Sequence, residues 1–133
     1  MKKIIVLHGE SSVGKTTTIK DVYEALLQNG AIELKTKKLI WGTGSDFEGF
    51  LEYNKLKITF FSEGDKRNIL EAAIERYKNK CDIFVCALNK KFQNIGISWL
   101  CASVSIFKIE KLAKTNADNE KAKNEIISLI NYV

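Results

Sequence analysis

The segment from Gly9 to Thr16 constrains the fold of this chain more than any other part of the sequence. It reads Gly-Glu-Ser-Ser-Val-Gly-Lys-Thr, so two glycines separated by four residues are followed by a lysine and a hydroxyl side chain. An apolar run at Lys3 to Leu7 precedes it, and apolar residues at helical spacing follow it from Lys15 to Gln28. This order predicts a buried strand, a tight loop and an amphipathic helix.

Each residue type in this segment, which we call the phosphate loop, favours binding of a polyphosphate. The glycines let several backbone N–H groups converge at the positive end of the helix. We expect Lys15 to contact the β- and γ-phosphates, Thr16 to ligate Mg²⁺ and Thr17 to contact the α-phosphate. The expected ligand is ATP with Mg²⁺, and the predicted nucleotide-binding residues are Gly9, Glu10, Ser11, Ser12, Val13, Gly14, Lys15, Thr16 and Thr17.

Beyond the loop, strand-like and helix-like segments alternate along the 133 residues. Alternation of this kind predicts an α/β fold, here a three-layer sandwich with a mainly parallel sheet and a single domain over residues 1–133. The expected strands are 3–7, 32–34, 47–53, 56–61, 82–88 and 103–109, with a further apolar piece at 39–41. The expected helices are 15–28, 66–78 and a closing helix from about 122 to 133.

The strand, the phosphate loop and the helix together resemble the opening of P-loop NTPases over residues 3 to 28. The resemblance implies a parallel sheet between layers of helices. A second segment, Glu63-Gly64-x-x-Arg67, is similar to the acid-Gly-x-Pro-Arg segment of nucleoside monophosphate kinases. It departs from that pattern at Lys66, where the family has proline, and at Glu63, where the family usually has aspartate.

An acid at the end of a second apolar strand would complete the Mg²⁺ site of such a protein. Glu63 follows the strand 56–61, so we predict that Thr16 and Glu63 hold the metal and that Lys15, Glu63 and Arg67 are catalytic. The alternative for Glu63 is an ordinary exposed glutamate. Asp65, which directly precedes a helix, is better explained as a helix cap.

The reaction is less constrained than the ligand. Asn89-Lys90-Lys91-Phe92 begins like a guanine-reading motif, but Phe92 replaces the aspartate that would pair with guanine, which favours adenine. ATP hydrolysis or transfer of the γ-phosphate to a small-molecule acceptor is the first hypothesis. Because only Arg67 and Arg76 are arginines, the alternative is a nucleotide-dependent switch or assembly subunit whose missing cation comes from a partner.

Composition limits the setting in which the protein works. The net charge of +5 fits phosphate-bearing ligands and weak nucleic-acid association, but a lysine-rich surface that serves solubility is the favoured explanation. No apolar run approaches the ~20 residues that cross a bilayer. Three cysteines without paired spacing and a single histidine, His8, argue against a zinc site and for a reducing compartment. We therefore expect a cytoplasmic protein without a membrane partner.

Trp41 and Trp99 are expected to pack, although Trp41 is also a candidate for the border of an acceptor pocket.

Overall fold

The computed structural model describes residues 1–10, 13–38, 46–63, 66–92 and 104–132. Within these ranges the chain forms an α/β fold with one six-stranded sheet and three helices. In chain order the elements are β1 (Lys3–Gly9), α1 (Lys15–Gln28), β2 (Ile32–Lys38), β3 (Phe47–Tyr53), β4 (Leu56–Phe61), α2 (Arg67–Tyr77), β5 (Ile83–Asn89), β6 (Ser105–Glu110) and α3 (Asn116–Asn131). The predicted 39–41 piece, the predicted cap Asp65, and both tryptophans lie outside the described residues.

The sheet is mixed, so the expectation of a mainly parallel sheet is met only in part. Its strand order is β2-β3-β4-β5-β1-β6. β4, β5, β1 and β6 run parallel to one another, whereas β3 is antiparallel to both β4 and β2. The turn at Asn54 and Lys55 is the physical reason, because both residues have positive φ (51° and 67°) and close a two-residue hairpin between β3 and β4.

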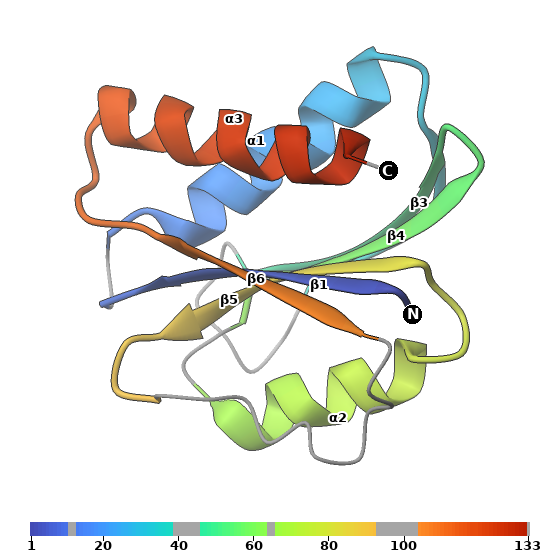
Figure 1. Ribbon diagram of the computed structural model, residues 1–133, viewed down its shortest axis with the longest axis horizontal. Helices are drawn as coiled ribbons and strands as arrows, with labels where there is room; N and C mark the ends of the chain where they lie inside the picture. Colours follow the sequence, from blue (N-terminus) through green and yellow to red (C-terminus); the bar gives the residue numbers. More distant parts are fainter. Residues whose placement is uncertain (11–12, 39–45, 64–65, 93–103, 133) are drawn as a thin grey trace.

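Helices cover both faces of the sheet, with α1 and α3 on one face and α2 on the other (Figure 1). Each face has its own apolar core. On the first, α1 and α3 supply Ile19, Val22, Tyr23, Leu26, Ala122, Ile126 and Ile130. On the second, α2 supplies Leu70, Ala73, Ile74 and Tyr77. Strand β1, between β5 and β6, contributes alternate residues to the two cores, as the two-residue period of a strand requires.

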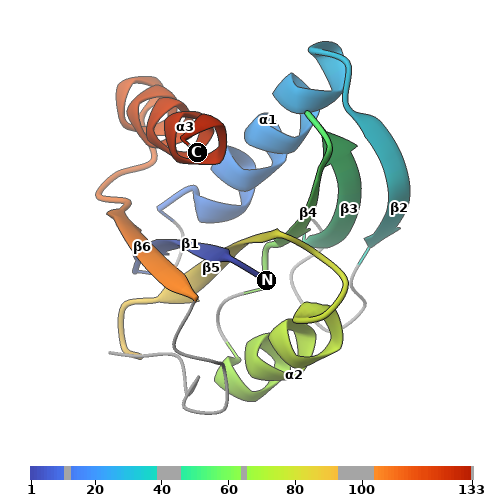
Figure 2. The same ribbon diagram turned by 45° about the vertical axis from the view of Figure 1, so that its right-hand side comes forward.

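The antiparallel part of the sheet curves around α1. Figure 2 shows β2 and β3 rising beside this helix. The Tyr23 ring packs edge-on against Phe47 and Phe60, with ring centroids 5.5 and 5.3 Å away. A Cβ atom at Gly49 would lie 2.6 Å from the same ring, so only glycine lets β3 approach α1 this closely.

Lys3 links the closing helix α3 to strand β1. Its Nζ donates hydrogen bonds to the carbonyl oxygens of Leu129 and Tyr132, at 2.6 and 2.8 Å. These carbonyls belong to the last turn of α3 and the residue after it, where backbone acceptors have no partner within the helix. A lysine at the negative end of a helix also interacts favourably with the helix dipole.

A buried carboxylate joins β3 to α2. Glu48 is 3% exposed, and its two oxygens accept hydrogen bonds from Tyr77 Oη at 2.5 Å and Arg76 Nη2 at 2.7 Å. Arg76 keeps about half of its side chain in solvent while it neutralises Glu48. Burial, followed by the hydrogen bond to Glu48, raises the pKa of Tyr77, so its hydroxyl stays protonated and able to donate.

Replacing Tyr77 with phenylalanine removes one donor from this buried carboxylate. We expect Tyr77→Phe to lower the free energy of unfolding by about 1–3 kcal/mol, measured by urea denaturation. Tyr132→Phe is the matched control, because Tyr132 is 69% exposed and its ring is kept. Equal stability of the two variants would contradict a structural role for the Tyr77 hydroxyl.

Candidate functional site

The site forms at the edge of the sheet where the parallel strands end. β1, β4, β5 and β6 run in one direction, so the segments that follow them meet at this edge. β3 runs against β4 and therefore begins there. The residues that this topology gathers are the phosphate loop after β1, Ser62 and Glu63 after β4, Asn89 and Lys90 at the end of β5, Lys111 after β6, and Asp46 before β3.

The described part of the phosphate loop is tightly built. Gly14 stands at the N-cap of α1 with φ of 88°, a left-handed conformation that favours glycine. Lys15 is only 8% exposed, and its Nζ donates to the carbonyl oxygens of Gly9 at 2.9 Å and Glu10 at 2.5 Å. The ammonium group of Lys15 therefore holds the start of the loop.

The remaining loop residues differ in exposure. Glu10 and Thr17 are exposed, and Val13 is half-buried. Ser11 and Ser12 lie outside the described residues. The exposed position of Thr17 leaves its hydroxyl accessible at the first turn of α1, as contact with a phosphate would require.

Asp46 is the acidic residue that faces the loop, and the sequence analysis missed it. The Thr16 hydroxyl donates to Asp46 Oδ1 at 2.9 Å, and Ser62 Oγ lies 3.2 Å from the same oxygen. Asp46 is 4% exposed and Ser62 is 3% exposed. The Phe47 amide donates to Ser62 Oγ at 2.8 Å, which fixes this hydroxyl beside the carboxylate. In the sequence Asp46 ends a Gly/Ser-rich turn, and only the antiparallel pairing of β3 brings it to this edge.

Glu63 and Arg67 differ from each other in their surroundings. Glu63 is 3% exposed, so the alternative of an ordinary exposed glutamate is wrong. Its strand, β4, is separated from β1 by β5, so Glu63 follows a strand two positions away from the loop. Arg67 Nε lies 3.6 Å from Glu71 Oε2 across one turn of α2, and its side chain is 42% exposed. Their predicted catalytic roles stay predictions.

Asn89 occupies the position between the loop and Glu63. It pairs with Gly9 across β5 and β1, and the next amide, that of Lys90, donates to the Gly9 carbonyl oxygen at 2.7 Å. Asn89 is 7% exposed, and its Oδ1 accepts from the Lys91 amide at 3.0 Å. The sequence signal for Asn89 is a polar residue at the end of a buried strand. The sequence analysis interprets Asn89 only as part of a guanine-reading motif.

Thr16, Asp46 and Ser62 form a donor set that suits a hard cation. All three present oxygen atoms, and Mg²⁺ is commonly held by one or two carboxylates together with substrate phosphates and water. Within the described part of the chain, no group of three or more His, Cys, Asp or Glu side chains could hold a metal by itself. A cation here would therefore depend on the Asp46 carboxylate together with hydroxyl groups and ligand oxygens.

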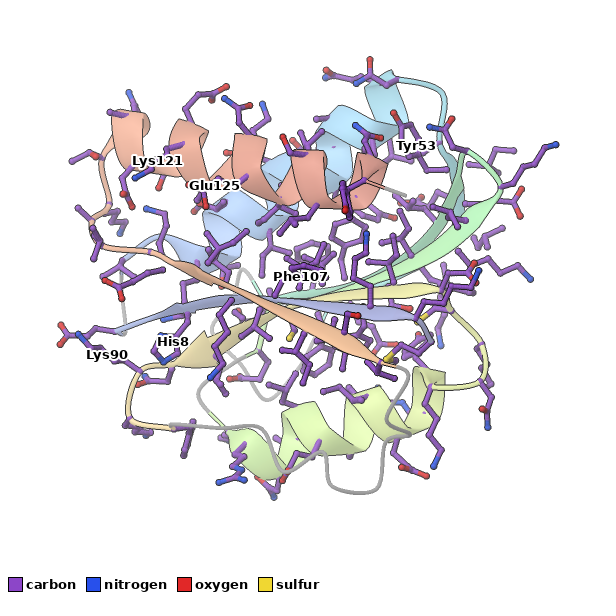
Figure 3. The ribbon with its side chains drawn as sticks, in the orientation of Figure 1. His8, Tyr53, Lys90, Phe107, Lys121 and Glu125 are labelled. Atoms are coloured by element: carbon purple, nitrogen blue, oxygen red, sulfur yellow. The ribbon has the colours of Figure 1, made fainter. Side chains whose placement is uncertain are left out.

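Three lysines and one glutamate act on the pKa of His8. His8 and Lys90 lie at the same end of the sheet (Figure 3). Burial is the largest cause that lowers the pKa of His8. The charges of Lys108, Lys90 and Lys15 lower this pKa further, against the opposing charge of Glu110. The lowered pKa favours the neutral form of His8 at pH 7.

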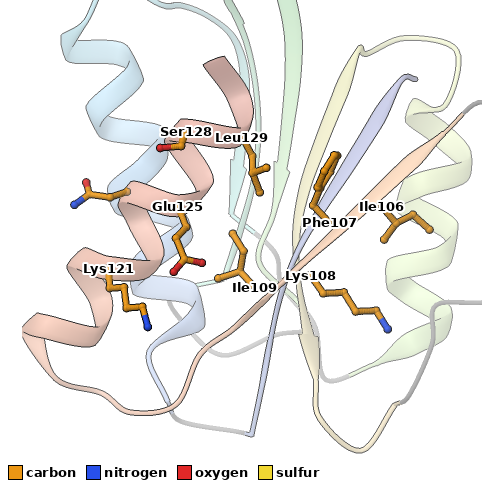
Figure 4. A pocket seen from close by; sticks show the side chains of 9 residues that line it. Ile106, Phe107, Lys108, Ile109, Lys121, Glu125, Ser128 and Leu129 are labelled. Atoms are coloured by element: carbon orange, nitrogen blue, oxygen red, sulfur yellow. The ribbon is translucent and has the colours of Figure 1, made fainter. Parts of the chain in front are cut away.

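A separate groove of about 750 Å³ lies between β6 and α3 (Figure 4). Phe107 and Ile109 line it from the strand, and Lys121, Glu125 and Leu129 line it from the helix. No residue of the phosphate loop lines this groove, so it is distinct from the candidate site. Among the described residues, no helix combines the length and apolar character needed to cross a membrane.

Comparison of the chain with protein-family models, with curated proteins and with solved structures found no match. The geometry at the carboxyl edge of the sheet is therefore the basis for assigning a function.

Proposed function

We propose that this protein has a P-loop NTPase fold and binds Mg-ATP, with the triphosphate on the phosphate loop and adenine favoured as the base. The observation that carries this proposal is the hydrogen bond between the Thr16 hydroxyl and buried Asp46, directly after a loop whose lysine is itself buried. A glycine loop that only connected a strand to a helix would not need a buried lysine and a buried carboxylate at its end.

The described residues can perform the steps that nucleotide binding requires. Lys15 Nζ now bonds the Gly9 and Glu10 carbonyl oxygens, and a triphosphate would offer it stronger, charged acceptors. The amino end of α1 has no side-chain cap, so its backbone N–H groups suit an anionic ligand. Asp46, Thr16 and Ser62 would hold Mg²⁺, which neutralises charge on the phosphates when bound. Glu63 and Asn89 lie on the neighbouring strand ends and are the candidates for orienting an attacking water or acceptor hydroxyl.

Hydrolysis of ATP or transfer of its γ-phosphate is the reaction that this arrangement suits best. A nucleotide-dependent switch or assembly subunit is the second candidate, and the arginines favour it. Arg67 is beside Glu71, and Arg76 is bonded to Glu48 on the face covered by α2. Arg76 neutralises buried Glu48, whereas Arg67 makes only an exposed pair at 3.6 Å, so a cation besides Arg67 for the transferring phosphate would come from a lysine here or from a partner.

The first test is the effect of Lys15→Ala on the affinity for Mg-ATP, measured by calorimetric titration. We expect affinity to fall by roughly 30- to 150-fold, corresponding to about 2–3 kcal/mol for lost charge-assisted hydrogen bonds. Lys20→Ala, at an exposed position of α1, is the matched control. Thermal unfolding of both variants separates loss of affinity from loss of stability. Unchanged affinity in folded Lys15→Ala would show that the loop does not bind the triphosphate.

The second test identifies the carboxylate that holds the metal. We expect Asp46→Asn to abolish most of the increase in ATP affinity that Mg²⁺ gives over EDTA, because it removes the charge beside Thr16. Glu24→Gln, at an exposed position of α1, should keep that increase. If Asp46→Asn keeps it and Glu63→Gln loses it, Glu63 holds the metal and the role proposed for Asp46 is wrong.

A further inference from the structure

One short segment packs against Gly9 and lies near Gly14, the two glycines of the phosphate loop. Residues 111–115, which we call the β6–α3 turn, connect the last strand to the closing helix. The Lys111 amide donates to the His8 carbonyl oxygen at 2.7 Å, and a Cβ atom on Gly9 would lie 2.5 Å from the Lys111 carbonyl oxygen. At the other end of the loop, a Cβ atom on Gly14 would lie 3.0 Å from Asn119 Oδ1 and 3.7 Å from Lys111 Nζ.

The β6–α3 turn is held together by one carboxylate. Asp118 Oδ2 accepts hydrogen bonds from Lys111 Nζ at 2.7 Å and from the amides of Leu112 and Ala113, both at 3.2 Å. Asp118 belongs to the first turn of α3, and its own amide donates to Thr115 Oγ1, the cap of that helix. The Lys111 hydrogen bond is the largest cause that lowers the pKa of Asp118, so this carboxylate is charged at neutral pH.

The buried ammonium group of Lys111 needs the Asp118 carboxylate as its opposite charge. Its side chain is 0% exposed, and it also donates to the Ala113 carbonyl oxygen. A buried ammonium group without an opposite charge is costly, and removing one partner of a buried pair destabilises its surroundings strongly. Because Lys111 lies against Gly9 through its backbone and near Gly14 through its side chain, a shift of Lys111 would reach both ends of the loop.

Within its described residues, the loop is also held by backbone hydrogen bonds to Gly9 and Gly14 and by the Lys15 side chain. Gly14 is the N-cap of α1, but no side chain caps that helix. The Lys15 hydrogen bonds to Gly9 and Glu10 are the ones that a triphosphate would replace. The hydrogen bond from the Lys111 amide to the His8 carbonyl oxygen does not involve the Lys15 ammonium group.

We propose that Lys111 and Asp118 are positioning residues for the phosphate loop: through the β6–α3 turn they keep Gly9 and Gly14 at the separation that a polyphosphate needs. The inference rests on the proposed function for its ligand, but the loop geometry can be tested without one. Two backbone amides report on it, since the Thr18 amide donates to the Gly14 carbonyl oxygen at 3.0 Å and the Lys90 amide donates to that of Gly9 at 2.7 Å.

The test compares Asp118→Asn with Asp82→Asn by amide hydrogen exchange in the absence of ligand. Asp82 is a matched control because its Oδ2 accepts from the Lys57 amide at 2.9 Å, at the opposite end of the sheet. We expect exchange of the Thr18 and Lys90 amides to accelerate about tenfold relative to the central amides of β5 in Asp118→Asn only. Equal acceleration in the two variants, or none in Asp118→Asn, would overturn the inference. Asp118→Glu, which restores the charge, should recover at least part of the protection.

Affinity for inorganic tripolyphosphate provides the second measurement. We expect Asp118→Asn to bind tripolyphosphate and ATP with dissociation constants raised by a common factor of about ten, because the defect concerns phosphate contacts and not the base. Unchanged tripolyphosphate affinity in this variant would contradict the proposal. If the unaltered protein binds neither ligand, the proposed nucleotide function fails, and the exchange measurement alone decides whether the turn positions the loop.

Discussion

The parallel pairing of β1 with both β5 and β6 is the constraint on which the rest of the structure depends. Lys3–Gly9 lies in register with Ile83–Asn89 on one side and with Ser105–Glu110 on the other. This pairing buries the strand and ends it at the edge where β4, β5 and β6 also end. The phosphate loop therefore begins from a rigid position, and its neighbours come from segments far apart in the sequence. In open α/β sheets this edge is where ligands commonly bind.

Charged groups buried at this edge set the chemistry of the site. Lys15, Asp46, Glu63 and Lys111 are each less than 9% exposed. Burial of charge is unfavourable unless partners compensate it, so a purely structural edge would be expected to contain apolar residues. The hydrogen bonds of Lys15 to loop carbonyls and of Asp46 to hydroxyl groups supply such compensation. Concentration of these groups around one loop supports a ligand-binding role for it.

The sequence predicted what depends on local pattern. The loop, α1 and the apolar strands follow from spacing and turn chemistry within short windows. Asp46 could not be predicted, because it lies thirty residues from Thr16 along the chain. The two side chains meet only because β3 runs against β4 and so begins at this edge of the sheet. The place of Asn89 depends on β5 lying between β1 and β4, and strand order is not encoded in any single segment. The same long-range arrangement separates Glu63 from the loop by one strand.

Mapping of amide chemical shifts during titration with Mg-ATP tests the central claim most directly. The account predicts saturable shifts that concentrate at Gly14 to Thr17, at Asp46 and at Asn89, with little change at Glu125 and Leu129 in the groove between β6 and α3. Shifts confined to that groove, or no shifts at millimolar Mg-ATP, would contradict nucleotide binding at the phosphate loop.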